Sequence, residues 1–139
     1  MNARLSLILC VVLAGCGEVS FKAISSPPPD RTALLDDAEG TIAVSQGVAL
    51  AIECTSTSSG HAGPCDGMTQ RVDDPGVARV LPVDLDELRQ RIVDGTVDNQ
   101  KPAVFVLAGV KPGTTTVRVT TEHGGATLEV TVAPVPAAR

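Results

Sequence analysis

Two neighbouring stretches of the chain, residues 41–44 and 48–54, alternate between apolar and polar side chains with a period of two. The apolar side chains that share a face are Ile42 and Val44 in the first stretch and Val48, Leu50, Ile52 and Cys54 in the second. Such alternation is typical of β-strands that bury one face, because successive side chains of a strand point to opposite sides. The letters SQG at 45–47 predict a turn between the two strands.

The C-terminal third of the chain repeats this pattern. The runs TTVRVTTE at 115–122 and TLEVTV at 127–132 place apolar side chains on one face and charged or hydroxyl side chains on the other. The glycine-rich link HGG at 123–125 predicts a β-hairpin. Upstream, the nearly continuous apolar run AVFVLAGV at 103–110 predicts a buried strand, and the following Lys-Pro-Gly suits a type II turn.

Short strands separated by turns predict an all-β fold, and we expect an antiparallel β-sandwich. Residues 76–80 add one more short strand after the break at Asp74 and Pro75. The insert 81–101 differs, because its apolar residues Leu85, Leu88 and Ile92 recur at helical spacing after DLDE, which resembles a capping box. We therefore expect one short helix between residues 84 and 94, which fits equally well as a lid over the sandwich or as a partner site.

The N-terminal residues have the features of an export signal. Arg4 precedes a short apolar run at 5–15, which is the size of a signal-peptide core. A membrane-spanning helix needs about 20 apolar residues, and this run is shorter. It ends in the letters LAGC at 13–16.

In every position LAGC resembles the lipobox of bacterial lipoproteins, in which Leu, Val or Ile is followed by a small residue, by Gly or Ala, and by Cys. The resemblance implies cleavage after Gly15, a diacylglycerol on the sulfur of Cys16 and an acylated amino terminus. The family's inner-membrane retention signal is Asp at the next position, where this chain has Gly17, so the resemblance favours the outer membrane. The alternative is a cysteine that follows an ordinary signal peptide by coincidence.

Residues 17–39 show no sustained periodicity and contain three prolines in a row at 27–29. Proline runs favour an extended polyproline II conformation, so we expect an extended stalk between the lipid and the domain. The expected organisation is therefore a signal peptide at 1–15, a lipidated tether at 16–39, the β-sandwich at 40–133 and a C-terminal tail at 134–139.

The order of the predicted strands resembles the bacterial Ig-like domain of the group 2 type. The matching stretches are IAVSQGVALAI, DDPGVARV, FVLAGVKPGTTTVRVTT and ATLEVTV, which together cover about 39–133. The resemblance implies an Ig-like sandwich, whereas function does not follow from fold. The family usually has a Trp shortly before the DPGVA-like stretch, and here Gln70 and Arg71 occupy that neighbourhood. Another side chain must therefore fill this part of the core.

Composition narrows the range of functions. The net charge is −5, and removal of Arg4 with the signal makes the mature chain more acidic still. An acidic chain does not attract phosphate backbones, so we expect no nucleic-acid partner, and we interpret the acidity as a solubility feature. The chain has no Trp or Tyr and only Phe21 and Phe105 among aromatics, which argues against a carbohydrate platform of stacked rings.

The sequence offers little catalytic chemistry. His61 and His123 lie outside known catalytic or metal-binding motifs, so we predict no catalytic residue, no metal ligand and no cofactor. A nucleophile pair of Cys54 and His61 is the catalytic alternative, but a second cysteine nearby in an exported chain argues against it. Acidic residues at loop ends are the alternative for calcium: Asp36, Asp37 and Glu39, or Asp73 and Asp74. Their spacing does not resemble an EF-hand, so solvated acids are the simpler interpretation.

The cysteines predict one disulfide. Four are encoded: Cys10 lies in the signal, Cys16 is assigned to the lipid, and Cys54 and Cys65 remain. An oxidising compartment favours a bond between the remaining two, which would close the Ser/Gly-rich loop between them. The alternative is two free thiols, one of them buried.

We interpret the chain as a cell-envelope lipoprotein that displays an Ig-like structural or interaction module and is not an enzyme. Its expected partners are the membrane, through the lipid anchor, and another envelope protein. The alternative is a small envelope lipoprotein that binds a ligand or calcium through the loop 55–64 and the insert 81–101.

Overall fold

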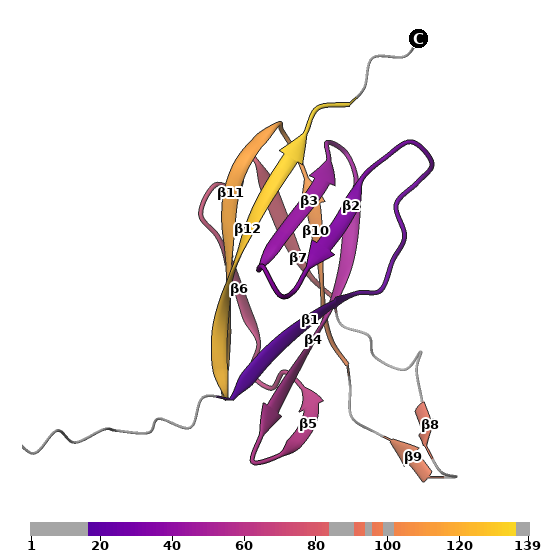
Figure 1. Ribbon diagram of the computed structural model, residues 1–139, viewed down its shortest axis with the longest axis vertical. Coiled ribbons are helices and arrows are strands. Elements are labelled where there is room, and N and C mark those ends of the chain that lie inside the picture. Colours follow the sequence, from indigo (N-terminus) through magenta and orange to yellow (C-terminus); the bar gives the residue numbers. More distant parts are fainter. Residues whose placement is uncertain (1–16, 84–90, 94–95, 99–101, 136–139) are drawn as a thin grey trace, which may run out of the picture.

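The computed structural model describes residues 17–83, 91–93, 96–98 and 102–135. In this part of the chain two five-stranded sheets form a β-sandwich (Figure 1). The first sheet has the order β1 (Glu18–Ala23), β4 (Ala49–Ser58), β10 (Ala103–Gly109), β7 (Ala78–Val83), and β5 (His61–Pro64) also pairs with β4. The second has the order β2 (Ala33–Asp36), β3 (Thr41–Ser45), β12 (Gly124–Ala133), β11 (Gly113–Thr121), β6 (Thr69–Val72). The prediction of an all-β sandwich is confirmed.

The core lies between the two sheets and is built from the apolar faces that the alternation predicts. Fully buried side chains come from both sheets, namely Leu50, Ile52, Phe105 and Leu107 from the first and Ile42, Val44, Val117, Val119, Leu128 and Val130 from the second. The β11 and β12 strands show the expected alternation of buried and exposed positions. Burial of these side chains is the main favourable term in folding.

The aromatic part of the core comes from the first sheet. Phe105 is completely buried, and its ring meets the ring of Phe21 edge-on, with centroids 6.3 Å apart and an interplanar angle of 80°. This arrangement is one that aromatic pairs prefer. On β6, Gln70 is half-buried and Arg71 is exposed, so the core's largest side chains come from the β1 and β10 strands instead.

The second sheet departs from the expected antiparallel arrangement at one pair of strands. The first sheet is antiparallel throughout, but β3 and β12 run parallel in the second, with Glu129 opposite Thr41 and Ala133 opposite Ser45. The chain crosses to the other sheet after β3 and returns to pair with β3 only in its last strand, so the two need no tight turn between them. Parallel neighbours require such a long connection.

The expected tether at 16–39 also needs correction, because part of it belongs to the sandwich. The β1 strand pairs with six residues of β4, and β2 pairs with four residues of β3. The prolines lie in the loop that connects β1 to β2. Each of these edge strands has only one buried residue, Phe21 in β1 and Ala33 in β2, so neither contains the repeated alternation by which a strand is recognised in sequence.

The insert departs from the expected helix as well, and the described residues contain no helix at all. Residues 91–93 form β8 (Arg91–Val93), which pairs with β9 (Thr96–Asp98), so the expected helix is wrong at its C-terminal end. Residues 84–90 lie outside the described residues. β-Branched residues such as Ile and Val favour strands, and a short helix begins with an unfavourable nucleus, so the local preference outweighs the helical spacing.

Candidate functional site

One end of the sandwich gathers segments that are far apart in the sequence, and we call it the hairpin end. It comprises Glu18 at the start of β1, the β4–β5 turn, Asp66 and the β11–β12 turn, that is, Glu18, Ser59, Gly60, His61, Asp66, Glu122 and His123. Figure 1 shows β5 and the start of β1 at the same lower end of the molecule. The amide of Glu122 donates a hydrogen bond of 3.0 Å to the carbonyl oxygen of Asp66, which joins two of these segments.

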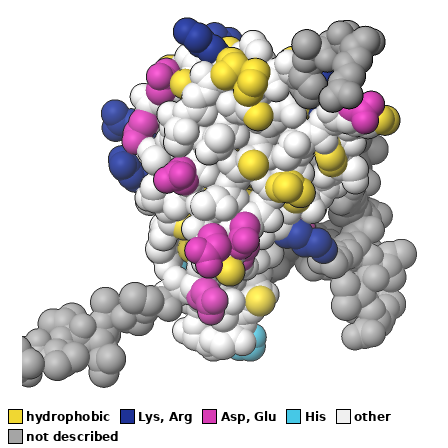
Figure 2. Space-filling model, turned by 45° about the horizontal axis from the view of Figure 1, so that its top comes forward, with side chains coloured by type: hydrophobic (Ala, Val, Ile, Leu, Met, Phe, Trp, Pro, Cys, Tyr) yellow, Lys and Arg dark blue, Asp and Glu magenta, His cyan; other side chains and the backbone are white. Residues whose placement is uncertain are grey.

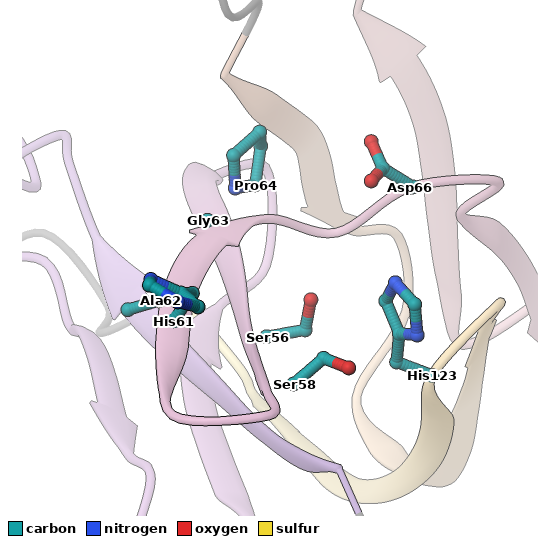
Figure 3. A pocket seen from close by; sticks show the side chains of 8 residues that line it. All are labelled: Ser56, Ser58, His61, Ala62, Gly63, Pro64, Asp66 and His123. Atoms are coloured by element: carbon teal, nitrogen blue, oxygen red, sulfur yellow. The ribbon is translucent and has the colours of Figure 1, made fainter.

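A shallow hollow opens at the hairpin end. Eight residues line it: Ser56, Ser58, His61, Ala62, Gly63, Pro64, Asp66 and His123. Figure 3 shows the side chains of Ser58 and His123 on facing sides of this hollow. Its volume of about 200 Å³ is below the range of roughly 300–1,000 Å³ that small-molecule sites occupy. The part of the chain that the structure describes also contains no group of three His, Cys, Asp or Glu that could hold a metal ion.

The structure joins Cys54 and Cys65 by a disulfide, as the sequence predicts. Their Cα atoms are 5.5 Å apart, and the two residues are 0% and 4% exposed. The amide of Cys65 also donates a hydrogen bond of 3.2 Å to the carbonyl oxygen of Cys54. With its sulfur bonded and buried, Cys54 is not available as a nucleophile for His61.

The disulfide closes an ordered hairpin. The β5 strand pairs with the end of β4, from Thr55 opposite Pro64 to Ser58 opposite His61. Ser59 and Gly60 form the turn, both with positive φ, 51° and 81°. The loop 55–64, which is the ligand-binding segment of the alternative function, is thus largely a paired β-structure.

The first of the two acidic clusters considered for calcium, Asp36, Asp37 and Glu39, has a structural role. An Asp37 carboxylate oxygen accepts a hydrogen bond of 2.8 Å from the amide of Phe21, which links the β2–β3 turn to β1. An Asp36 carboxylate oxygen accepts one of 3.1 Å from the amide of Glu39 within that turn. These are the local bonds by which Asp stabilises turns.

The second acidic cluster is similar. The Asp74 carboxylate accepts a hydrogen bond of 2.8 Å from the amide of Gly76, and the hydroxyl of Thr116 donates to the Asp73 carboxylate. The amide of Asp74 donates in turn to the hydroxyl of Thr115 at 2.9 Å. Both clusters are therefore explained by the strand connections that they hold, and neither favours calcium binding.

The remaining candidate for a contact surface is the outside of the sandwich. On the face drawn in Figure 2, acidic and basic side chains are interspersed, and hydrophobic side chains form small separate groups. Where the structure describes burial, the large exposed hydrophobic residues on strands are Leu34 on β2 and Leu81 on β7, which are 65% and 55% exposed. Both belong to strands at the edge of a described sheet, and an edge strand can pair with another chain through its backbone. In β7, Pro82 limits such pairing because it has no N–H.

The expected lipidation site, Cys16, lies outside the described residues, whereas its neighbour Gly17 is described. Gly17 packs against the β11–β12 turn so closely that a Cβ atom there would overlap the carbonyl oxygen of His123. Sequence reasoning missed this contact and the hollow beside it. The described residues contain no helix that is long and apolar enough to cross a membrane.

No family model matches this chain, and no curated protein matches it in sequence. Among solved structures it is similar to domains 4 and 5 of the S-layer protein SbsC, with a TM-score of 0.51 and 16% identity over 78% of this chain and 54% of that chain. Domains 5 and 6 of SbsC match with a TM-score of 0.50 and 16% identity, over 78% of this chain and 45% of that one. The chain thus spans about half the length of these two structures. At this identity the likeness shows the fold alone, a two-sheet Ig-like sandwich.

Proposed function

We propose that this chain is a cell-envelope lipoprotein that displays one Ig-like domain of the group 2 type as a structural or interaction module without enzymatic activity. The lipid on Cys16 anchors it in the outer membrane. The observation that carries the proposal is the lipobox LAGC at 13–16, followed after one residue by the first strand of a β-sandwich. Export, anchor and displayed domain then follow one another directly along the chain.

The fold adds support through the two glycines of the motif GVKPG. A Cβ atom at Gly109 would lie 2.9 Å from the carbonyl oxygen of Ser45, where the two sheets approach each other. Gly113 has a φ of +152°, which other residues rarely adopt. Both glycines of the Ig-like motif thus have a structural reason in this chain. The likeness to domains of a surface layer protein is in keeping with a module that builds or contacts the cell surface.

Lipidation is tested by metabolic labelling with a fatty acid and by phase partition in detergent. The wild-type protein should incorporate the label and enter the detergent phase, because the diacylglycerol and the acylated amino terminus give it more than one acyl chain, which is what stable anchoring needs. Cys16→Ala should abolish both. Cys10→Ala is the matched control, since it changes a cysteine of the same signal segment outside the lipobox. A wild-type protein that is soluble and begins at a residue other than Cys16 would disprove the proposal.

The partner is tested on the edge strands. Cross-linking in intact cells, followed by purification, should recover an envelope protein with the wild-type chain. Leu34→Glu and Leu81→Glu each place a charge at an exposed apolar position, so at least one of them should reduce that yield. Thr127→Glu is the control on an exposed position of an interior strand. Equal yields for all three variants would argue against contact through the edges.

A further inference from the structure

The chain connects the lipidation site to the sandwich without a spacer. Gly17 packs on the carbonyl oxygen of His123, and its own carbonyl oxygen would lie 3.2 Å from a Cβ atom at Gly124. From the next residue onward, β1 is paired with β4, beginning with Glu18 opposite Thr57. The backbone is therefore fixed on the domain from Gly17.

Covalent geometry then limits how far the lipid can be from the domain. Consecutive Cα atoms are about 3.8 Å apart, so the Cα atom of Cys16 is no farther than that from the Cα atom of Gly17, which is held against the β11–β12 turn. If the sulfur of Cys16 carries a diacylglycerol, its acyl chains lie in the bilayer. The segment that holds Gly17 must then lie at the bilayer surface.

From this, and resting on the proposed lipid anchor, we propose that the hairpin end lies against the lipid headgroups of the membrane. The opposite end, which carries the β10–β11 connection with Lys111, points away from the membrane. The nine residues of β11 join the two ends, and at about 3.3 Å per residue they separate them by roughly 30 Å.

The surface of the hairpin end fits contact with headgroups rather than insertion. None of the large exposed hydrophobic residues in the described part of the chain, Leu34, Leu81 and Val135, belongs to it. Its charged residues are three acids, Glu18, Asp66 and Glu122, and the seven residues that define it include no Lys or Arg. In Figure 2 no dark blue side chain lies at the end that carries a histidine. Basic residues are what draws a protein surface to acidic lipids, so the covalent anchor holds this end in place.

The chain has no Trp and no Tyr, which allows a direct test with a single introduced fluorophore. His61→Trp places it at the hairpin end and Lys111→Trp at the opposite end, both at exposed positions. Each lipidated protein is reconstituted into vesicles of phosphatidylethanolamine and phosphatidylglycerol that contain a lipid with a nitroxide on its headgroup. We expect loss of fluorescence for His61→Trp and little loss for Lys111→Trp.

A spacer supplies the matched control. About ten Gly/Ser residues inserted between Cys16 and Gly17, beginning with Gly, span roughly 16–19 Å on average. They should restore most of the fluorescence of His61→Trp. Glu122→Trp serves as a second reporter at the hairpin end, and circular dichroism checks that each variant keeps its strands.

The outcomes separate this proposal from the one on which it rests. Absence of fatty-acid label on the vesicle-bound protein would mean that the anchor itself is wrong. A labelled protein with equal quenching at positions 61 and 111, or with no quenching at either, would overturn the orientation and leave the anchor intact.

Discussion

The disulfide between Cys54 and Cys65 should contribute a large share of the stability of this domain. The bond closes a short loop, with a sequence separation of 11. On the chain-entropy model, a loop of that length restricts the unfolded chain enough to stabilise the fold by about 3 kcal/mol at 25 °C. Single domains have a total free energy of unfolding of roughly 5–15 kcal/mol, so the cross-link is a substantial fraction of it.

Replacement of both cysteines should cost more than reduction, because the two changes remove different contributions. Reduction breaks the cross-link and keeps both sulfur atoms in a core where Cys54 is 0% and Cys65 4% exposed. The double variant Cys54→Ala/Cys65→Ala also deletes the two sulfur atoms. The cavity that they leave in the core adds about 1 kcal/mol or more to the loss of stability. We expect losses of about 3 kcal/mol on reduction and about 4 kcal/mol for the double variant.

The measurement is urea unfolding of the mature chain made soluble by Cys16→Ala, with and without reductant. The midpoint should fall with reduction while the slope with urea changes little, apart from expansion of the unfolded state. Reductant should leave the midpoint of the Cys54→Ala/Cys65→Ala variant unchanged, which is the control. Oxidised and reduced forms that differ by less than about 1 kcal/mol would refute the reasoning from loop entropy. Alkylation of both cysteines in the unreduced, denatured protein would refute the bond itself.

Four further substitutions, of which Gly60→Ala is a control, test the packing and one hydrogen bond between a side chain and the backbone, each by urea unfolding. Gly109→Ala should lower the free energy of unfolding by about 2–3 kcal/mol, because its Cβ atom meets a backbone oxygen of the opposite sheet. Gly60→Ala, with a φ of +81° and open space around it, should lower it by about 1 kcal/mol. Equal losses would contradict this account of the close approach. Asp37→Ala should lower the free energy of unfolding by about 1–2 kcal/mol, because it removes the hydrogen bond of 2.8 Å from the amide of Phe21. Hydrogen exchange at that amide should become faster. Unchanged exchange would show that the bond is unimportant. Phe105→Ala, at a fully buried position, should lose about 3–5 kcal/mol, and a loss below about 2 kcal/mol would mean that the core collapses to fill the space.

The sequence was informative wherever a strand buries several side chains of one face. The strands at 41–45, 49–58, 113–121 and 124–133 each place two or more apolar residues at alternate positions in the core, and all four were predicted within a few residues. Such a period has a single structural explanation, since only a strand brings every second side chain to the same side. The apolar run at 103–109 was also predicted, because both its length and its bounding turn favour a strand.

Edge strands were the main failure, for a physical reason. The β1, β2, β5 and β6 strands each bury at most one side chain, and the backbone pairing that joins each of them to a neighbour leaves no trace in the side-chain pattern. The parallel pairing of β3 with β12 is equally invisible in sequence, since alternation shows which face is buried and not which neighbour a strand has. The expected extended conformation of the prolines at 27–29 is also not what the structure shows, because the amide of Arg31 donates a hydrogen bond of 3.2 Å to the carbonyl oxygen of Pro28 and closes a turn there.

The candidate site shows the same limit. The Cys54–Cys65 pair could be predicted, because export and elimination of the other cysteines left one combination. The hairpin end could not, because it assembles Glu18, the β4–β5 turn and the β11–β12 turn through the pairing of edge strands. The close approach of Gly17 to His123 depends on that same pairing. The one local signal of this close approach is the lack of a side chain at Gly17. The lipobox resemblance had offered another reason for that glycine, the absence of the Asp that retains lipoproteins in the inner membrane.

The correction of the tether changes what this domain can reach from the membrane. A stalk over 16–39 in polyproline II conformation would have placed the sandwich up to roughly 70 Å from the lipid, at about 3.1 Å per residue. With β1 at Glu18–Ala23 and β2 at Ala33–Asp36, part of this segment is folded into the sandwich, and the far end of the sandwich stands roughly 30 Å from the headgroups if the anchor is as proposed. The exposed edge residues Leu34 and Leu81 then lie within that layer. A partner that binds them must itself be at the membrane surface or extend to within a few tens of ångströms of it, which favours another membrane-attached protein over one fixed to a distant layer of the envelope.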